Sequence, residues 1–272
     1  DLAQQLVTQE PGRSFDIMMG GGMGKFVPKE WLDAHGNVGE RSDGRDLLSS
    51  WLENNPQGVV AKNREELLNL DLNKTSKIMG LFQSKLMDFH VVANATQQPT
   101  LAEMTEVALK KLSQNPNGYF VFIEGGLIDY GNHANMAGVA IDETLELEKA
   151  VKLAREMTNE EDTLIVVTSD HAHPVSISGY PGRGTNILGL NEHDTDANGV
   201  PYATLNYAVG TQQYLDAQGE RVDLTGQIGK KNDPTFIFPS YIKSSQGNHA
   251  GDDVGVFASG PQSHLFTGSL QQ

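Results

Sequence analysis

The stretch YFVFIEGGLIDYGNHANMAG, residues 119–138, decides the fold, because an apolar run leads directly into charged and metal-binding side chain types. The run Tyr119–Ile123 has the composition of a buried strand. Glu124, Asp129 and His133 follow it within ten residues, and burying such side chains is costly unless something compensates them. The pattern therefore predicts a strand that ends at a functional site.

A second stretch, TLIVVTSDHAH at residues 163–173, repeats this arrangement. The unbroken apolar run 164–168 is typical of a strand in a parallel sheet. Asp170, His171 and His173 follow it. Two runs that both end in carboxylates and imidazoles point to one shared site.

The segment between the two runs has the periodicity of a long helix. Apolar residues recur at steps of four, seven, four and three: Met136, Ala140, Leu147, Val151 and Ala154. Strand, helix and strand of these lengths predict a βαβ unit, whose parallel strands lie near each other. Functional groups gather at the carboxyl ends of such strands, so we expect the two sets of side chains to converge.

His249 extends this site. It lies in the small-residue loop SQGNHAGDD, just before a predicted final strand at 253–258. The chain has no cysteine, so any metal ion here is held by nitrogen and oxygen. Imidazoles with carboxylates suit zinc, and a neighbouring site made only of oxygen atoms suits magnesium.

The rest of the chain alternates short strands and helices, which predicts an α/β fold with three layers and a mostly parallel central sheet flanked by helices. A Thr100-x-x-Glu103 capping box opens the helix predicted at 100–115. The other predicted elements are helices at 2–9, 46–54 and 64–70 and strand-like runs at 15–19, 78–82 and 89–92.

The change in composition along the chain predicts a core and one inserted region. Residues 179–247 are dominated by Asn, Asp, Gly, Gln and Thr, which indicates an inserted, irregular region. Residues 1–178 and 248–272 would then form the α/β core. Both ends of the sequence resemble truncated ends, since DLAQQLVTQ begins like the middle of a helix. We therefore expect a fragment or a processed chain.

The totals exclude some classes of partner. Net charge is −15, from 20 basic and 35 acidic residues, which argues against a nucleic-acid partner. No run of eighteen apolar residues is present, so the sequence predicts no membrane span.

Simpler explanations stand beside the metal site. A single Asp-x-x-x-His pair often arises by chance, and His173 could be a core histidine or a hydrogen-bond partner of a ligand carboxylate. His35, His90, His193 and His264 have no partner residues at ligand spacing and are predicted to be surface or packing residues.

The motifs EGGLIDYGNHA, SDHAH, GYPGRG and NHAGDDVGVFASGPQSHLFTG occur in the order and at the spacing of the alkaline phosphatases, which this chain resembles over nearly its whole length. The sequences of these motifs are most similar to those of secreted or membrane-anchored animal members and animal-like bacterial members. The resemblance implies a phosphate-monoester hydrolase that acts through a phosphoserine intermediate, with two zinc ions and one magnesium ion per active site.

The resemblance also implies a role for each matching residue. Asp129, His133 and His249 match the ligands of the first zinc. Asp170 and His171 match ligands of the second zinc, and Glu124 matches a magnesium ligand.

Three further residues match supporting positions. His173 matches a partner that hydrogen-bonds a zinc-binding carboxylate. Tyr130 stands near the phosphate position, where animal members usually carry His and the enterobacterial type carries Lys. Tyr180 matches a tyrosine of the dimer interface. The nucleophilic serine and the phosphate-binding arginine are expected upstream of residue 1, so we expect this chain alone to be inactive.

Two alternatives remain open at the level of sequence. One is a related metalloenzyme of the same superfamily, such as a phosphodiesterase, a sulfatase or a phosphoglycerate mutase. The other is a truncated, non-catalytic chain that binds metal. For the phosphatase, the resemblance implies small phosphate monoesters as substrates, a homodimer, and an extracellular or periplasmic location with a possible membrane anchor in the parent protein.

Overall fold

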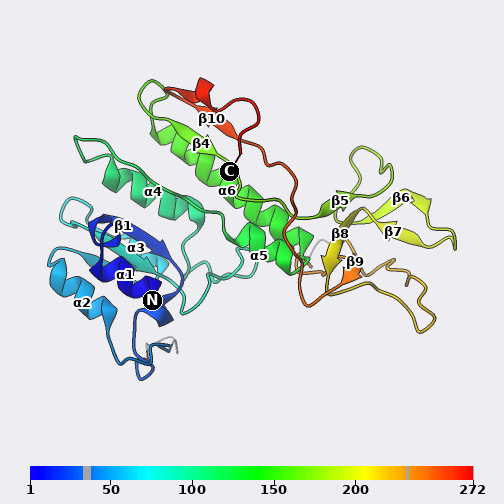
Figure 1. Ribbon diagram of the computed structural model, residues 1–272, viewed down its shortest axis with the longest axis horizontal. Helices are drawn as coiled ribbons and strands as arrows, with labels where there is room; N and C mark the ends of the chain where they lie inside the picture. The colour runs from blue at the N-terminus through cyan, green and yellow to red at the C-terminus, as the bar shows by residue number, and fades with distance from the viewer. Residues whose placement is uncertain (33–37, 231–232, 272) are drawn as a thin grey trace. The chain divides into compact units, whose positions relative to one another are not determined.

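Figure 1 shows the computed structural model of the chain, which describes residues 1–32, 38–230 and 233–271. The chain divides into two compact units. The first contains Asp1–Glu124 and Glu146–Met157, and the second contains Gly125–Leu145 and Thr158–Gln272.

The first unit is a small three-layer α/β structure. Its parallel sheet has the order β1-β3-β2, with β3 in the centre. The elements are α1 (Leu2–Thr8), β1 (Ile17–Gly20), α2 (Leu47–Asn54), β2 (Val59–Ala61), α3 (Arg64–Leu68), β3 (Ile78–Leu81) and α4 (Leu101–Leu112), with short 3-10 turns at Gly12–Ser14 and Met23–Lys25.

Alternation along β3 produces the layers, because successive side chains of a strand point to opposite faces. Met79 packs into a cluster with residues of α1 and α2, among them Trp51. Ile78 packs on the other side with Leu67 of α3 and Val107 of α4. The predicted α/β class, with helices on both faces of a parallel sheet, is confirmed.

Local sequence signals fix the helix ends of this unit. Thr100 and Glu103 form the predicted capping box of α4: the Thr100 hydroxyl accepts from the Glu103 N–H, and the Glu103 carboxylate accepts from the Thr100 N–H. Asp46 caps α2 by accepting from the N–H groups of Leu48 and Ser49, each at 3.0 Å. Each cap satisfies backbone donors that have no partner within the helix.

In its described residues, the second unit contains two helices and three small sheets. Its order is α5 (Leu127–His133), α6 (Ala137–Met157, whose later turns belong to the first unit), β4 (Ile165–Val167), β5 (Val175–Ile177), β6 (Leu190–Thr195), β7 (Pro201–Ala203), β8 (Leu205–Gly210), β9 (Ser240–Lys243), β10 (Phe257–Ser259) and a 3-10 turn at Ser263–Leu265. The sheets are β5-β8-β9, β6-β7 and β10-β4. A core around Leu205, Tyr207 and Phe238 packs against Ala137 at the start of α6.

Two predicted strands are not formed in the described structure. Residues 89–92 form turns, in which the N–H of Val92 donates to the carbonyl of Phe89, and not a strand. Tyr119–Ile123 is in no strand, and Phe120 and Phe122 are 88% and 79% exposed. A strand requires a hydrogen-bonded neighbour, and this run finds none among the described residues.

The predicted βαβ unit, with two parallel strands, is consequently not formed. Its second strand, β4, pairs antiparallel with β10, with Val167 opposite Phe257. The final strand begins at Phe257, inside the predicted range of 253–258, and ends at Ser259. Residues 179–247 all belong to the second unit, and their assignment as an insertion stays a prediction. Among the described residues, no helix is both long and apolar enough to cross a membrane.

Candidate metal centre

Helix α5 presents two of the predicted ligands. Asp129 and His133 are four residues apart, which places both on one face of the helix. The distance from His133 Nε2 to Asp129 Oδ2 is 3.3 Å. The sequence pattern marked these residues only as part of a strand end, and the structure places them on a helix that begins after Gly126.

A backbone pairing brings the other histidines to this helix. Ala172 and Ala250 form an antiparallel bridge, with the N–H of Ala250 donating to the carbonyl of Ala172 at 2.8 Å. The flanking residues His171, His173 and His249 are thereby held together. The rings of His171 and His249 are stacked, with centroids 3.5 Å apart.

Asp129 lies at the centre of the resulting cluster. Its Oδ1 is 2.6 Å from His173 Nε2 and 3.3 Å from His249 Nε2. His249 Nε2 is 3.0 Å from His133 Nε2. Within the described part of the chain, one donor atom from each of these four residues lies within 4.8 Å of the others.

The orientation of His133 is set by a backbone carbonyl. His133 Nδ1 is 2.6 Å from the oxygen of Gly247, and because a carbonyl only accepts, Nδ1 carries the proton. In the neutral ring Nε2 therefore presents a lone pair to Asp129 and His249. A lone pair, a carboxylate oxygen and a second imidazole nitrogen repel one another unless a cation, either a proton or a metal ion, lies among them.

His173 is held differently from the other histidines. Its Nε2 must carry the proton that it donates to the Asp129 carboxylate, so this nitrogen has no lone pair with which to bind a metal ion. Burial lowers the pKa of His173, as do the nearby His133 and His249, while Asp129 acts in the opposite direction. In the described structure its buried Nδ1 has no hydrogen-bond partner. This arrangement favours a neutral ring that orients Asp129.

The donor set fits a zinc ion. Two imidazole nitrogens and one carboxylate oxygen are typical zinc ligands, and no thiolate is needed. Two nitrogens bound to one tetrahedral zinc at about 2.0–2.1 Å are roughly 3.3 Å apart. The 3.0 Å between the Nε2 atoms of His133 and His249 is close to that separation.

The remaining predicted ligands are less closely gathered. His171 Nε2 is 3.8 Å from Asp129 Oδ1 and 3.3 Å from Asp170 Oδ2. The Asp170 side chain is 77% exposed. Glu124 is exposed and belongs to the first unit. The assignments of Asp170 and His171 to a second zinc and of Glu124 to magnesium stay predictions.

The other predicted positions are at or near the surface. Tyr130 is exposed beside the cluster, with its ring centroid 6.4 Å from that of His133. Tyr180 is 92% exposed, and His264 is exposed on the last 3-10 turn. His35 lies outside the described residues.

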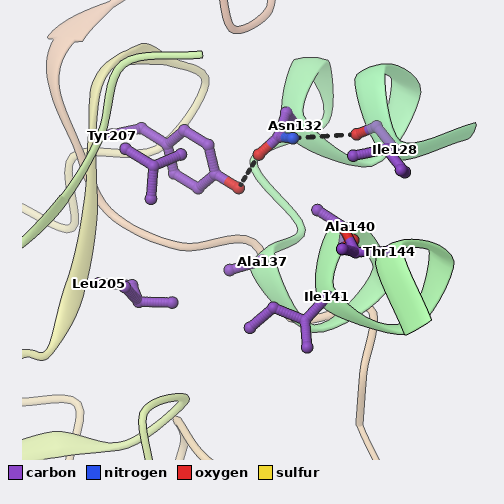
Figure 2. A pocket seen from close by; sticks show the side chains of 9 residues that line it. Ile128, Asn132, Ala137, Ala140, Ile141, Thr144, Leu205 and Tyr207 are labelled. Atoms are coloured by element: carbon purple, nitrogen blue, oxygen red, sulfur yellow. Dashed lines mark hydrogen bonds between the residues drawn. The ribbon is translucent and has the colours of Figure 1, made fainter. Parts of the chain in front are cut away.

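A pocket of about 180 Å³ lies beside α5, between the start of α6 and the strands β5 and β8 (Figure 2). Ile141, Leu205 and Tyr207 are among its mostly apolar lining residues. The Tyr207 hydroxyl donates to Asn132 Oδ1 at 2.9 Å, and Asn132 Nδ2 donates to the Ile128 carbonyl at 3.0 Å. The pocket contains no carboxylate or imidazole in its described lining, so the polar chemistry of this unit is in the histidine cluster.

Comparisons with known proteins show the family of this chain. The alkaline phosphatase family model matches residues 1–272. The chain therefore belongs to the alkaline phosphatase family.

Curated relatives support the same family. The chain is 37% identical over 278 residues to a membrane-bound alkaline phosphatase of Bombyx mori, covering 100% of this chain and 50% of that protein. It is 36% identical over 281 residues to the tissue-nonspecific alkaline phosphatase of Gallus gallus, again covering 100% of this chain and 53% of the relative. The chain thus spans about half the length of the curated relatives it matches.

Solved structures share the fold. The alkaline phosphatase of the Antarctic bacterium TAB5 superimposes with a TM-score of 0.58 at 20% identity, covering 97% of this chain and 58% of that chain. A variant of the TAB5 enzyme with Mg bound in its M3 site gives a TM-score of 0.61 at 21% identity, with the same coverage.

Proposed function

We propose that this chain is part of a metal-dependent phosphate-monoester hydrolase and that Asp129, His133 and His249 hold one of its zinc ions. The single observation that carries the proposal is the approach of His133 Nε2 and His249 Nε2 to 3.0 Å around the Asp129 carboxylate. Family membership supplies the reaction class.

A bound zinc ion would supply Lewis-acid chemistry, lowering the pKa of a coordinated hydroxyl and offsetting the charge of the phosphoryl group. The chain's own residues prepare that site. The Gly247 carbonyl fixes the His133 tautomer, so that Nε2 is free to coordinate. His173 holds the Asp129 carboxylate in place through its Nε2–H. Such partners of a ligand fix its orientation and raise its basicity.

We further propose the full set of roles that the family resemblance implies. Asp170 and His171 contribute to a second zinc, and Glu124 contributes to a magnesium site. Tyr130 faces the bound phosphate, where its neutral phenol replaces a basic residue. The nucleophilic serine, which forms the phosphoserine intermediate, and the phosphate-binding arginine belong to a part of the protein outside these 272 residues.

The assembly and location are also proposals. Exposed Tyr180 is assigned to a homodimer interface, where an exposed aromatic side chain would be covered. The Bombyx mori relative is described as membrane-bound, which supports an extracellular or periplasmic protein that is anchored in some members.

The experiment that tests the function compares three classes of ester as substrates, and compares the longer protein with the 272-residue chain. The protein that includes the upstream serine segment should hydrolyse a phosphate monoester in preference to a diester or a sulfate ester, and it should incorporate phosphate from the monoester at serine. The 272-residue chain alone should bind zinc but show no turnover. Preference for a diester or a sulfate ester would instead support the related metalloenzymes, and turnover by the short chain would contradict the assignment of the nucleophile.

A further inference from the structure

Helix α5 is followed, two residues after its last residue His133, by a buried asparagine whose backbone is in the left-handed region. Asn135 has a φ of 56° and is 0% exposed. Its N–H donates to the carbonyl of Asn132, and the N–H of Met136 donates to the carbonyl of Gly131, both at 2.9 Å. These two bonds form a Schellman motif, in which glycine is the usual residue and asparagine the second choice.

A glycine at position 135 would end the helix equally well, so the presence of asparagine is explained by the contacts of its side chain. Asn135 Nδ2 donates to the Val209 carbonyl at 3.1 Å, and Oδ1 accepts from the Thr211 N–H at 3.2 Å. The amide thus pairs with the end of β8 as a neighbouring strand would. There is no room for a Cβ at Gly210, where it would lie 2.1 Å from Asn135 Oδ1.

The same residue adjoins the segments that lead to His249. The Asn135 carbonyl accepts from the Phe238 N–H at 2.8 Å, just before β9. A Cβ added to Gly247 would lie 3.1 Å from Asn135 Nδ2. The N–H of Gly247 donates to the His133 carbonyl at 2.7 Å, and Gly247 precedes His249 by two residues.

We infer that Asn135 is a positioning residue of the metal centre. Its buried amide joins the end of the helix that carries Asp129 and His133 to the end of β8. The neighbouring strand β9 pairs with β8 and leads toward His249, so this joint sets the separation of the ligand atoms. This inference rests on the proposed metal centre. Asn135 itself contributes no ligand, and it acts through the backbone around His133 and Gly247.

The chain offers a matched control for a buried asparagine. Asn191 in β6 is also buried, and its amide makes the same pair of bonds, donating to the Ser178 carbonyl at 3.2 Å and accepting from the His193 N–H at 3.0 Å. Substituting aspartate at either position removes the amide donor while keeping the size of the side chain. Only the substitution at Asn135 should alter the metal centre.

The experiment measures zinc affinity by competition with a chelator, together with the visible absorption of bound Co²⁺, at a temperature where every variant is folded. Asn135→Asp and Asn135→Gly should each weaken zinc binding by roughly tenfold and change the Co²⁺ spectrum, as loss of a ligand's support does. The glycine variant keeps the left-handed turn without strain, so its effect isolates the amide. Asn191→Asp should leave both readouts unchanged, because the bonds of its amide join Ser178 and His193 and no residue of the metal centre.

The outcomes separate this inference from the proposed function. If the unmodified chain binds no zinc, the proposed metal centre is wrong. If it binds zinc and both Asn135 variants bind equally well with the same spectrum, the centre stands and the positioning role is overturned. An equal loss in Asn191→Asp would also overturn it, since the effect would then be a general loss of stability.

A measurement on the unmodified chain covers the case in which the variants do not fold. Metal binding and the network around Asn135 must stabilise each other if they are coupled. Zinc should therefore slow amide hydrogen exchange at Thr211, Phe238 and Gly247 more than at His193, the donor to Asn191. Equal exchange at the first three amides with and without zinc would contradict the inference.

Discussion

His133 and His249 are 116 residues apart in sequence, and their Nε2 atoms lie 3.0 Å apart in the structure. The Asp129 carboxylate lies against both imidazoles, at 3.3 Å from each Nε2. Such an approach of two lone-pair donors and an anion is stable only with a cation among them. This relationship gives the first expected outcome.

His249→Ala should reduce the zinc bound per chain, because it removes one of three proposed ligands and leaves an incomplete site. Bound zinc is measured by elemental analysis after gel filtration. His264→Ala, at an exposed histidine on the last 3-10 turn, is the matched control and should leave zinc content unchanged. Unchanged zinc content in His249→Ala would remove it from the ligand set.

His173→Ala should have a different signature. Since His173 Nε2 donates to Asp129, its loss should weaken zinc affinity by about 10–100-fold while the content at saturating zinc stays the same. A zinc titration that reaches saturation measures both quantities. Loss of the ion even at saturation would show that His173 is itself a ligand.

Glu124→Gln should raise the magnesium concentration needed for full activity in the protein that includes the upstream serine segment, because a neutral amide is a weaker magnesium ligand than a carboxylate. Activity is measured against added magnesium with zinc held constant. Glu160→Gln, at an exposed acidic residue outside the motif, serves as the control. An identical magnesium dependence for Glu124→Gln and the unmodified protein would reject the assignment.

Tyr207→Phe should cost about 1 kcal/mol of unfolding free energy at pH 8, because it removes a buried hydrogen bond to Asn132. Burial raises the pKa of Tyr207. A raised pKa in the folded state means that this contribution is present below the unfolded value of about 10 and is lost as the pH rises above it.

The measurement for this residue is urea unfolding at pH 8 and above pH 10. The unmodified chain should lose more stability over this interval than Tyr207→Phe. Tyr241→Phe is the control, since Tyr241 is 84% exposed and its substitution should change neither value. A Tyr207→Phe variant with the same pH dependence as the unmodified chain would contradict this prediction.

Arg64→Gln should move acid unfolding to higher pH. Burial alone would raise the pKa of Glu103, but hydrogen bonds from Arg64 and Thr100 lower it below its ordinary value. A lowered pKa contributes stability above the unfolded value of about 4.3, and this stability is lost as the pH falls through the folded value.

Acid titration followed by circular dichroism measures the midpoint for Arg64→Gln. Arg13→Gln is the control, because the ion pair of Arg13 with Glu10 is exposed on both sides and such pairs contribute little. Equal acid midpoints for the two variants would show that the Arg64–Glu103 pair does not stabilise the folded state.

The features that could be predicted from sequence are local or periodic. The capping box at Thr100 and the apolar spacing from Met136 to Ala154 depend on neighbours within one or two turns, and the structure has both helices. The buried run at Ile78 is likewise a strand. The structure also brings together the motif residues Asp129, His133 and His249, whose side chain types are costly without a cation, and their assignment as zinc ligands stays a prediction.

The route by which these residues meet could not be predicted. The sequence predicts that two neighbouring parallel strands bring these residues together. In the structure, helix α5 carries Asp129, and the Ala172–Ala250 bridge holds His249 beside it. Both the bridge and the Gly247 carbonyl at His133 are backbone contacts, which leave no residue pattern. Asn135 gave no signal either, because an asparagine after a helix normally indicates only a turn.

The exposure of Phe120 has a related explanation. Apolar composition indicates that a run favours burial, but not which strand will cover it. In the described structure no strand pairs with Tyr119–Ile123, and the chain spans about half the length of its curated relatives.

The wide spacing of the donors along the chain has a kinetic consequence. Asp129 meets His173 across 44 residues and His133 meets His249 across 116, so the site exists only after large loops have closed. We expect zinc to be captured late in folding, when the rate-limiting barrier has already been crossed. The ion would then act chiefly by slowing unfolding, and chelation should shorten the lifetime of the native state far more than it delays its formation.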